Sequence, residues 1–146
     1  MTTVSDLLKD KGDEVWSIGP DKTVYDAIKL MDMKGIGALV VISGDKLVGI
    51  ISERDYARKI ILKDRASKNT SVQEIMTREV FYTIPEQKVE ECMVMMTSHH
   101  IRHLPVMKDK KVTAMITLGD VVKEIIKEQN DKIKYLEDYV TWSESY

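Results

Sequence analysis

The sequence lacks the features that mark disulfide-linked, membrane-spanning and nucleic-acid-binding proteins. It has one cysteine, Cys92, among 146 residues, so no disulfide can form within the chain, which is typical of a reducing compartment. No apolar run approaches the ~18 residues that a membrane-spanning helix needs. The formal net charge is −2, so the whole molecule is not drawn to a polyanion. What remains is an ordinary globular chain, long enough for about one domain.

Targeting and catalytic motifs are also missing. Residues 1–14 have no apolar core and carry several acids, so they resemble neither a secretory signal nor an arginine-rich transit peptide. We therefore expect a cytoplasmic protein. No nucleophile–base–orienter set, glycine-rich phosphate loop or GxGxxG motif is present. We expect no enzymatic activity and no catalytic cofactor.

What the sequence does contain is a copy of itself. When the first half is aligned with the second at a shift of 65 residues, many positions hold the same residue type. The aligned pairs include Pro20/Pro85, Val24/Val89, Met31/Met96, Ile36/Ile101, Leu39/Leu104, Val41/Val106, Ile51/Ile116, Asp55/Asp120 and Ile60/Ile125. Such a period indicates one supersecondary unit used twice. Because each half alone would bury only a marginal core, we expect the halves to bury apolar surface on each other.

Each half predicts the order strand, helix, strand, strand, helix. The first helix has one apolar face at i, i+3, i+4 and i+7. Those faces are Val24, Ala27, Ile28 and Met31, and Val89, Cys92, Met93 and Met96. Apolar runs around a short turn predict hairpins within 38–51 and 103–116. The apolar faces of the second helices are expected to be Tyr56, Ile60 and Ile61, and Val121, Ile125 and Ile126. Short first strands are expected near Val15–Ile18 and Val80–Ile84.

Four segments follow one another along the chain. They are a first repeat over 1–63, a polar linker over 64–71, a second repeat over 72–128 and a helical tail over 129–146. The segment Val4–Leu8 at the start of the first repeat is similar in sequence to Val72–Met76 at the start of the second, and we call these two segments the lead-ins. The tail has apolar residues at helical spacing, among them Ile133, Leu136 and Val140, but is too short to fold alone. We expect it to dock on its own domain or on a second subunit.

A hydroxyl residue and an aspartate recur where each hairpin runs into its second helix. These are Ser52 and Asp55 in the first half, and Thr117 and Asp120 in the second. One interpretation is a capping box, in which the hydroxyl caps the helix and the acid returns to the cap N–H. The other is a nucleotide site, because a helix N-terminus binds phosphate and an aspartate can accept from ribose hydroxyls. The recurrence in both halves favours the nucleotide site.

At these residues the chain resembles a known family. The two halves are similar to a tandem pair of cystathionine β-synthase (CBS) domains, over roughly Val4 to Lys127. The motifs that carry the resemblance are Thr23–Ala27, Gly37–Val41, Gly49–Tyr56, Ile101–Val106 and Met115–Val121. The stretch Ser52–Lys59 resembles small stand-alone CBS pairs, which are similar to the regulatory part of inosine monophosphate dehydrogenase. One departure is Ala114, where the first half has Gly49.

The resemblance implies a fold and a function. It implies an α/β (α+β) fold of two β-α-β-β-α repeats packed by pseudo-twofold symmetry, plus a C-terminal helix, and a homodimer built through helices. It implies a regulatory module that binds AMP, ADP, ATP, NAD or S-adenosylmethionine in the cleft between repeats. The candidate nucleotide-binding residues are Gly37, Ala38, Ser52, Arg54, Asp55, Arg58, Arg102, His103, Thr117 and Asp120. Asp55 and Asp120 would hold ribose, and Ser52 and Thr117 would contact phosphate or ribose.

The cations differ between the halves. Arg102 and His103 have no basic counterparts, since Gly37 and Ala38 occupy those places. Arginine suits bidentate phosphate contacts. Arg54 and Arg58 could serve either cleft, or could lie on a solvated helix face.

Other readings stay open at this point. His99, His100, His103 and Cys92 are zinc ligand types, but a structural zinc site needs four converging groups, and Cys92 falls on a core face. Lys108, Lys110 and Lys111 could contact nucleic acid, although a solvated turn explains them and we expect no nucleic-acid partner. The main alternative to nucleotide sensing is a ligand-free dimerisation or scaffold protein, and the effector protein is unknown.

Overall fold

A computed structural model describes residues 2–144 of the chain. Met1, Ser145 and Tyr146 lie outside the described residues, and with them the outer ends of the expected segments 1–63 and 129–146. The chain forms two compact units. Unit 1 holds segments 1–13, 83–104 and 116–146, and unit 2 holds segments 14–82 and 105–115. Neither unit is one sequence repeat, and each is described here by itself.

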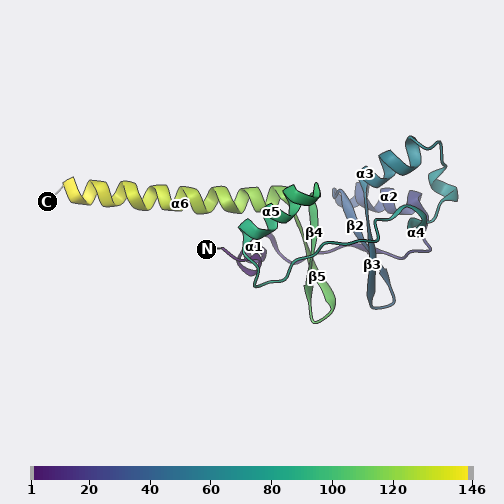
Figure 1. Ribbon diagram of the computed structural model, residues 1–146, viewed down its shortest axis with the longest axis horizontal. Coiled ribbons are helices and arrows are strands. Elements are labelled where there is room, and N and C mark those ends of the chain that lie inside the picture. The colour runs from purple at the N-terminus through teal and green to yellow at the C-terminus, as the bar shows by residue number, and fades with distance from the viewer. Residues whose placement is uncertain (1, 145–146) are drawn as a thin grey trace. The chain divides into compact units, whose positions relative to one another are not determined.

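Unit 2 is built on a small sheet with helices beside it (Figure 1). The sheet has the order β1 (Ser17–Ile18), β2 (Ala38–Ser43), β3 (Lys46–Ser52), with β1 parallel and β3 antiparallel to β2. The helices are α2 (Val24–Lys34), α3 (Glu53–Tyr56), which continues as a π-helix over Ala57–Ile61, a 3-10 turn at Ser67–Asn69, and α4 (Val72–Ile75).

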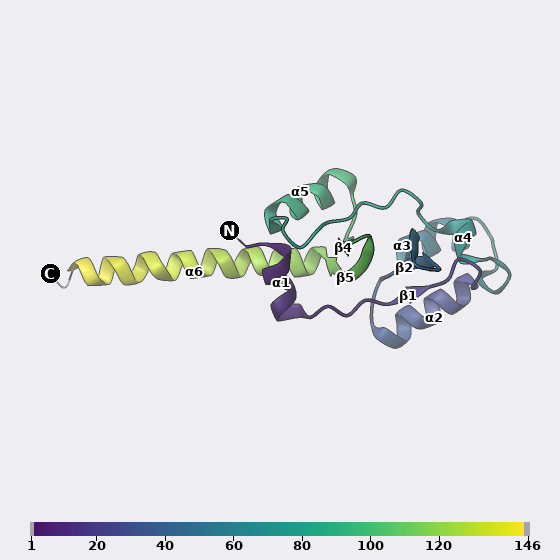
Figure 2. The same cartoon turned by 90° about the horizontal axis from the view of Figure 1, so that it is seen from below.

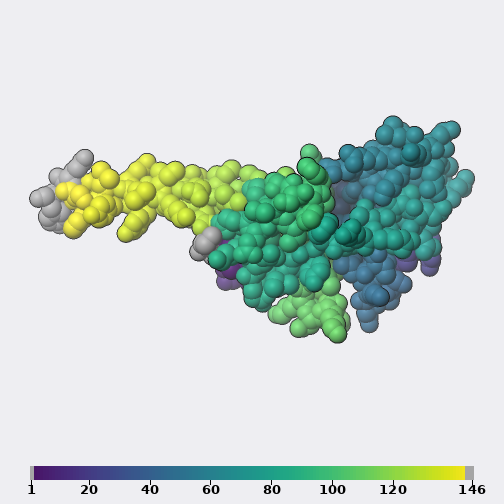
Figure 3. Space-filling model, viewed as in Figure 1, coloured from purple at the N-terminus to yellow at the C-terminus, as the bar shows by residue number. Residues whose placement is uncertain are grey.

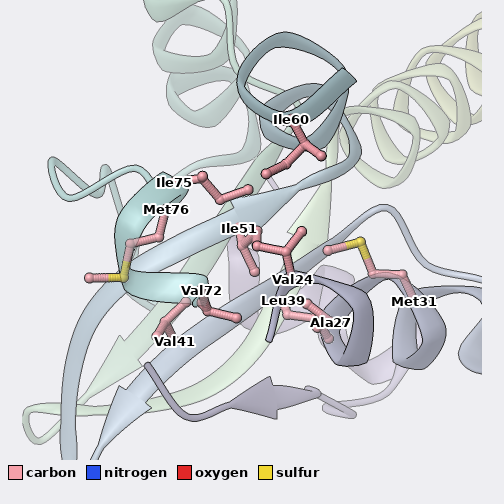
Figure 4. Packing of buried hydrophobic residues seen from close by; sticks show 10 residues of the cluster. All are labelled: Val24, Ala27, Met31, Leu39, Val41, Ile51, Ile60, Val72, Ile75 and Met76. Carbon is pink, nitrogen blue, oxygen red and sulfur yellow. The ribbon is translucent and has the colours of Figure 1, made fainter. Parts of the chain in front are cut away.

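The core of unit 2 confirms the apolar face predicted for the first helix. Its buried cluster combines one face of α2, the inward residues of β2 and β3, and the short α4 (Figure 4). The members are Val24, Ala27, Met31, Leu39, Val41, Ile51, Ile60, Val72, Ile75 and Met76. Val24 and Ala27 are fully buried, because the i, i+3 spacing turns both toward the sheet.

Unit 1 contains three helices, α1 (Val4–Lys11), α5 (Val89–His99) and α6 (Leu118–Glu144). Val89, Cys92 and Met96 are buried on α5, as their spacing predicts. The second hairpin joins β4 (His103–Lys108) to β5 (Lys111–Thr117); its outer ends belong to unit 1, whereas residues 105–115 belong to unit 2. Its turn residues Asp109 and Lys110 both have positive φ, 51° and 65°. Positive φ at both central residues matches the twist of the flanking strands in a two-residue hairpin.

The two lead-in helices are bound by equivalent backbone hydrogen bonds in the two units. In unit 1, the Val4 N–H donates to the Gln87 carbonyl at 2.8 Å. In unit 2, the Val72 N–H donates to the Lys22 carbonyl, also at 2.8 Å. Lys22 and Gln87 are aligned positions of the repeat. Each lead-in therefore packs in a unit with the repeat that does not follow it in the sequence.

The structure corrects two predictions about the elements. No strand of the sheets forms at Val80–Ile84, where the backbone makes only an isolated bridge at Thr83. Ile61 is 59% and Ile126 54% exposed, so neither belongs to a buried face. The wider turn of the π-helix buries Ile60 and leaves Ile61 outward.

The structure confirms that the tail is helical. One continuous helix, α6, covers both the last helix of the second repeat and the tail up to Glu144 (Figure 2). No residue in this stretch breaks a helix, since it has neither proline nor an internal glycine after Gly119. Among residues 2–144, no helix combines the length and the apolar character needed to cross a bilayer.

Candidate functional site

The N-terminus of α6 carries the hydroxyl–aspartate motif of the second repeat. The Thr117 hydroxyl accepts from the Asp120 N–H at 3.1 Å, and Asp120 Oδ2 accepts from the Thr117 N–H at 2.8 Å. This reciprocal pair is a capping box, which fixes where the helix begins. The Leu118 N–H donates to the Arg102 carbonyl at 2.9 Å, so the start of β4 lies beside the start of α6.

A hollow of about 630 Å³ opens at this helix end, and we call it the Arg102 hollow. It is lined by Arg102, His103, Thr117, Leu118, Gly119, Val122, Lys123 and Ile126. The structure thus brings together three predicted site residues, Arg102, His103 and Thr117. Cationic side chains, a hydroxyl and the positive end of a helix dipole meet there, and this combination attracts a phosphate or another anion.

Asp120, the fourth predicted site residue of this repeat, is not among the residues that line the Arg102 hollow. It lines a second hollow, between α1 and α6, together with Asp10, Lys11 and Lys127. Lys11 Nζ lies 2.5 Å from Asp120 Oδ2, the same oxygen that accepts from Thr117. Burial acts to raise the pKa of Asp120, but the Lys11 ammonium and the Thr117 N–H outweigh it and hold that pKa below its ordinary value.

The equivalent motif in unit 2 has the same capping box but a more crowded carboxylate. Asp55 Oδ2 accepts from the Ser52 N–H at 3.0 Å and from its hydroxyl at 3.1 Å. Asp55 Oδ1 accepts from the Thr77 hydroxyl at 3.1 Å and pairs with Lys59 Nζ at 3.0 Å. Asp55 is only 7% exposed. Both of its oxygens are thus engaged by residues of unit 2.

The other predicted residues of the first repeat are spread around this helix start. Ala38 pairs with Ser52 across β2 and β3, and the Gly37 carbonyl accepts from the Glu53 N–H at 3.1 Å. The side chains of Arg54 and Arg58 are exposed. A hollow of about 530 Å³ on unit 2 is lined by residues such as Tyr25, Tyr56 and Lys68, and it includes none of the predicted site residues.

Three contributors were missed by sequence reasoning. Lys123 lines the Arg102 hollow, and its alignment with Arg58 is the signal that could have found it. Lys11 and Thr77 bind the two aspartates from segments next to the lead-ins. Lys11 and Asp120 lie far apart in the sequence, and no spacing pattern connects them.

Cys92 and the histidines do not gather into a site. Burial raises the pKa of the Cys92 thiol, whose Sγ lies 3.4 Å from the Thr83 hydroxyl. His99 and His100 are exposed at the end of α5. Within residues 2–144, no group of three or more His, Cys, Asp or Glu side chains is placed to hold a metal ion.

Comparison with known proteins identifies the repeats. The family model of the CBS domain matches residues 3–62 and again 72–127. The Arabidopsis thaliana "CBS domain-containing protein CBSX3, mitochondrial" is 45% identical over 95% of this chain and 72% of its own length.

Two solved structures share the fold. A putative signal-transduction protein with CBS domains from Burkholderia ambifaria is 50% identical, with a TM-score of 0.83 over 88% of this chain and 96% of that one. The CBS domain pair of protein MJ0100, in complex with 5′-methylthioadenosine and S-adenosyl-L-methionine, is 25% identical, with a TM-score of 0.76 over 85% of this chain and 99% of that one. Two matches to the family model cover nearly the whole chain, and we conclude that it belongs to the CBS domain family as a tandem pair.

Proposed function

We propose that this chain is a non-catalytic regulatory module that binds an adenosine-containing ligand, such as AMP, ADP, ATP, NAD or S-adenosylmethionine. Membership in the CBS domain family supports a regulatory role. A related CBS pair forms a complex with two adenosine-containing molecules. A ligand would regulate by binding one arrangement of the protein more tightly than another, because only a difference in affinity can shift an equilibrium.

The observation that carries the proposal is the Arg102 hollow. Arg102, Lys123 and Thr117 line it beside the N-terminus of a 27-residue helix. A phosphate bound there would receive charged hydrogen bonds together with the positive end of the helix dipole. In this proposal His103 lies along the base; Asp120 lines the neighbouring hollow, where ribose hydroxyls would compete with Lys11 for its carboxylate.

The first repeat would provide a second, weaker site. Its candidate residues stay Gly37, Ala38, Ser52, Arg54, Asp55 and Arg58. A ribose there must displace the Thr77 hydroxyl or Lys59 from Asp55. Displacing either contact costs free energy, because both oxygens of the buried Asp55 are already engaged.

A scaffold function is the second candidate. Both aspartates are engaged in capping boxes, which is what a structural role requires. In that case the hollows would stay empty and the protein would act by assembly. Homodimer formation, a cytoplasmic location and the effector protein stay predictions; the name of the Arabidopsis relative places that protein in mitochondria.

The decisive experiment is calorimetric titration of AMP and of adenosine into the wild-type protein and Arg102→Ala. A charged phosphate contact contributes about 1.5–3 kcal/mol, so AMP should bind Arg102→Ala roughly 10- to 150-fold more weakly. Adenosine has no phosphate to lose, and its affinity should change little. Arg78→Ala is the matched control, since Arg78 is exposed, binds the Gln73 carbonyl and is not among the residues that line the Arg102 hollow.

Two results would contradict the proposal. If neither AMP nor adenosine binds the wild-type protein at millimolar concentration, the scaffold function is favoured. If Arg102→Ala weakens both ligands equally, Arg102 does not contact a phosphate and the Arg102 hollow is not the phosphate site.

A further inference from the structure

The outer part of α6 carries an exposed apolar stripe with no partner among the described residues of unit 1. From residue 129 to residue 143 every side chain is exposed. Ile133 is 52%, Leu136 59% and Val140 53% exposed. In the space-filling view this stretch (yellow) stands clear of the helices α1 and α5, against which the first turns of α6 pack (Figure 3). A stripe of large aliphatic residues is unfavourable in water unless another surface covers it.

The stripe has the spacing of a coiled coil. Val122, Ile126, Gln129, Ile133, Leu136 and Val140 follow one another in alternating steps of four and three residues. In the heptad notation abcdefg, Ile126, Ile133 and Val140 take position a, whereas Val122, Gln129 and Leu136 take position d. All three a positions hold β-branched residues, and one of the three d positions, Leu136, holds leucine. β-Branched residues at a with leucine at d favour two parallel helices over three or four. The residues that such pairing would bury are all exposed on α6.

The charges beside the stripe agree with the parallel arrangement. Lys132 falls at position g and Glu137 at the following position e. In a parallel pair, g of one helix faces the next e of the other, so each Lys132 would meet the Glu137 of the second copy. Lys132 is 62% exposed and only loosely paired with Glu128, at 3.8 Å, so it is placed to make that contact.

We propose that α6 pairs with α6 of a second copy of this chain as a short, parallel, two-stranded coiled coil. The six stripe residues form its core, and two of them, Val122 and Ile126, also border the Arg102 hollow. The stripe spans roughly 27 Å at 1.5 Å per residue, which is short for an isolated coiled coil. Here the first turns of α6 are already packed on α5 and α1, so folding of unit 1 nucleates the helix. The inference does not depend on any ligand.

The first test is the mass of the full chain by sedimentation equilibrium. Leu136→Asp should raise the dissociation constant of the wild-type assembly by about 100-fold or more, because two core leucines are lost and two carboxylates face each other. Tyr135→Asp is the matched control: Tyr135 is the neighbouring residue, is 71% exposed and lies off the stripe. Equal assembly of the two variants, or a monomeric wild-type protein, would overturn the proposal; the second result would point to a different protein as the partner.

The second test fixes the orientation. Leu136→Cys should form an intermolecular disulfide on mild oxidation, since position d meets its own copy in a parallel pair, while Tyr135→Cys should not. Cys92 is buried and should not compete. Lys132→Glu should weaken the dimer, and adding Glu137→Lys should restore it. A Leu136→Cys disulfide no faster than that of Tyr135→Cys, or no rescue by the double exchange, would overturn the parallel pairing.

Discussion

Asp120 shows how one side chain can be held by two parts of the chain. Its Oδ2 accepts from Thr117 at the start of α6 and from Lys11 at the end of α1. Both donors favour the ionised carboxylate, and together they outweigh the effect of burial on its pKa. A carboxyl whose pKa is lower in the folded than in the unfolded protein stabilises the fold above its unfolded pKa. That stabilisation is lost as the pH falls through the folded pKa.

We therefore expect Lys11→Met to raise the pKa of Asp120, because burial then acts with less opposition. The variant should be less stable than the wild type at pH 7, by an amount that shrinks as the pH falls below the ordinary aspartate pKa of 3.8. The pKa can be measured by NMR titration of the Asp120 carboxyl, and stability by urea unfolding at pH 7 and pH 3. Lys9→Met, on the same helix but paired only with Asp6, is the control. A stability difference that is the same at both pH values would contradict the ion pair.

Part of the candidate site could be predicted from the sequence. Arg102, His103 and Thr117 were predicted from the repeat and its family resemblance, and they line one hollow. The sequence could not show that Asp120 lines a different hollow, because its partner there, Lys11, is distant in the sequence. Nor could it show that Thr77 and Lys59 engage Asp55, since both contacts arise only when α3, β3 and α4 pack together.

At the scale of elements, β3 lies close to the residues that follow α4. A Cβ on Gly49 would lie 2.6 Å from Met76 Sδ and 3.0 Å from the Thr77 carbonyl oxygen. The backbone hydrogen bonds between Ile50 and Thr77, at 2.8 and 3.0 Å, hold the two segments at this separation. A side chain at position 49 of β3 would therefore collide with Met76 and Thr77, so this position favours glycine. The aligned position of β5 holds Ala114, which is fully buried.

Gly49→Ala should destabilise the protein by about 1–3 kcal/mol, because the added methyl group must push Met76 and the Thr77 backbone away. Thermal or urea unfolding measures this loss. Gly19→Ala is the control: Gly19 has no positive φ, and its added Cβ would meet only Lys22 Cγ at 3.9 Å. Unfolding curves that coincide for the two variants would show that α4 can move off β3 without loss.

The elements themselves were largely predictable, because the repeat doubles every weak signal. The hairpins and the first helices lie where periodicity placed them. The absent strand at Val80–Ile84 and the π-helix at Ala57–Ile61 were not predictable. Apolar periodicity does not distinguish a π-helix from an α-helix, and short strands are strongly context-dependent.

At the scale of the whole molecule, a bound ligand should raise thermal stability. A ligand present at 100 times its dissociation constant adds roughly 2.7 kcal/mol. For a chain of this size we expect a rise in Tm of roughly 5–15 °C with AMP, ATP, NAD or S-adenosylmethionine. Differential scanning fluorimetry measures it, with guanosine and uridine nucleotides as controls for base recognition. An unchanged Tm with every adenosine ligand at millimolar concentration would favour the scaffold function.

The lead-in helices have one more consequence, for the origin of the chain. Each lies in a unit with the repeat that it does not precede, which is how arms are exchanged in a domain-swapped homodimer. Duplication and fusion of a gene for one lead-in and one repeat would turn such a swapped dimer into a single chain. The hydrogen bonds at Gln87 and Lys22 are then the same ancestral contact, once made between two molecules and now made twice within one.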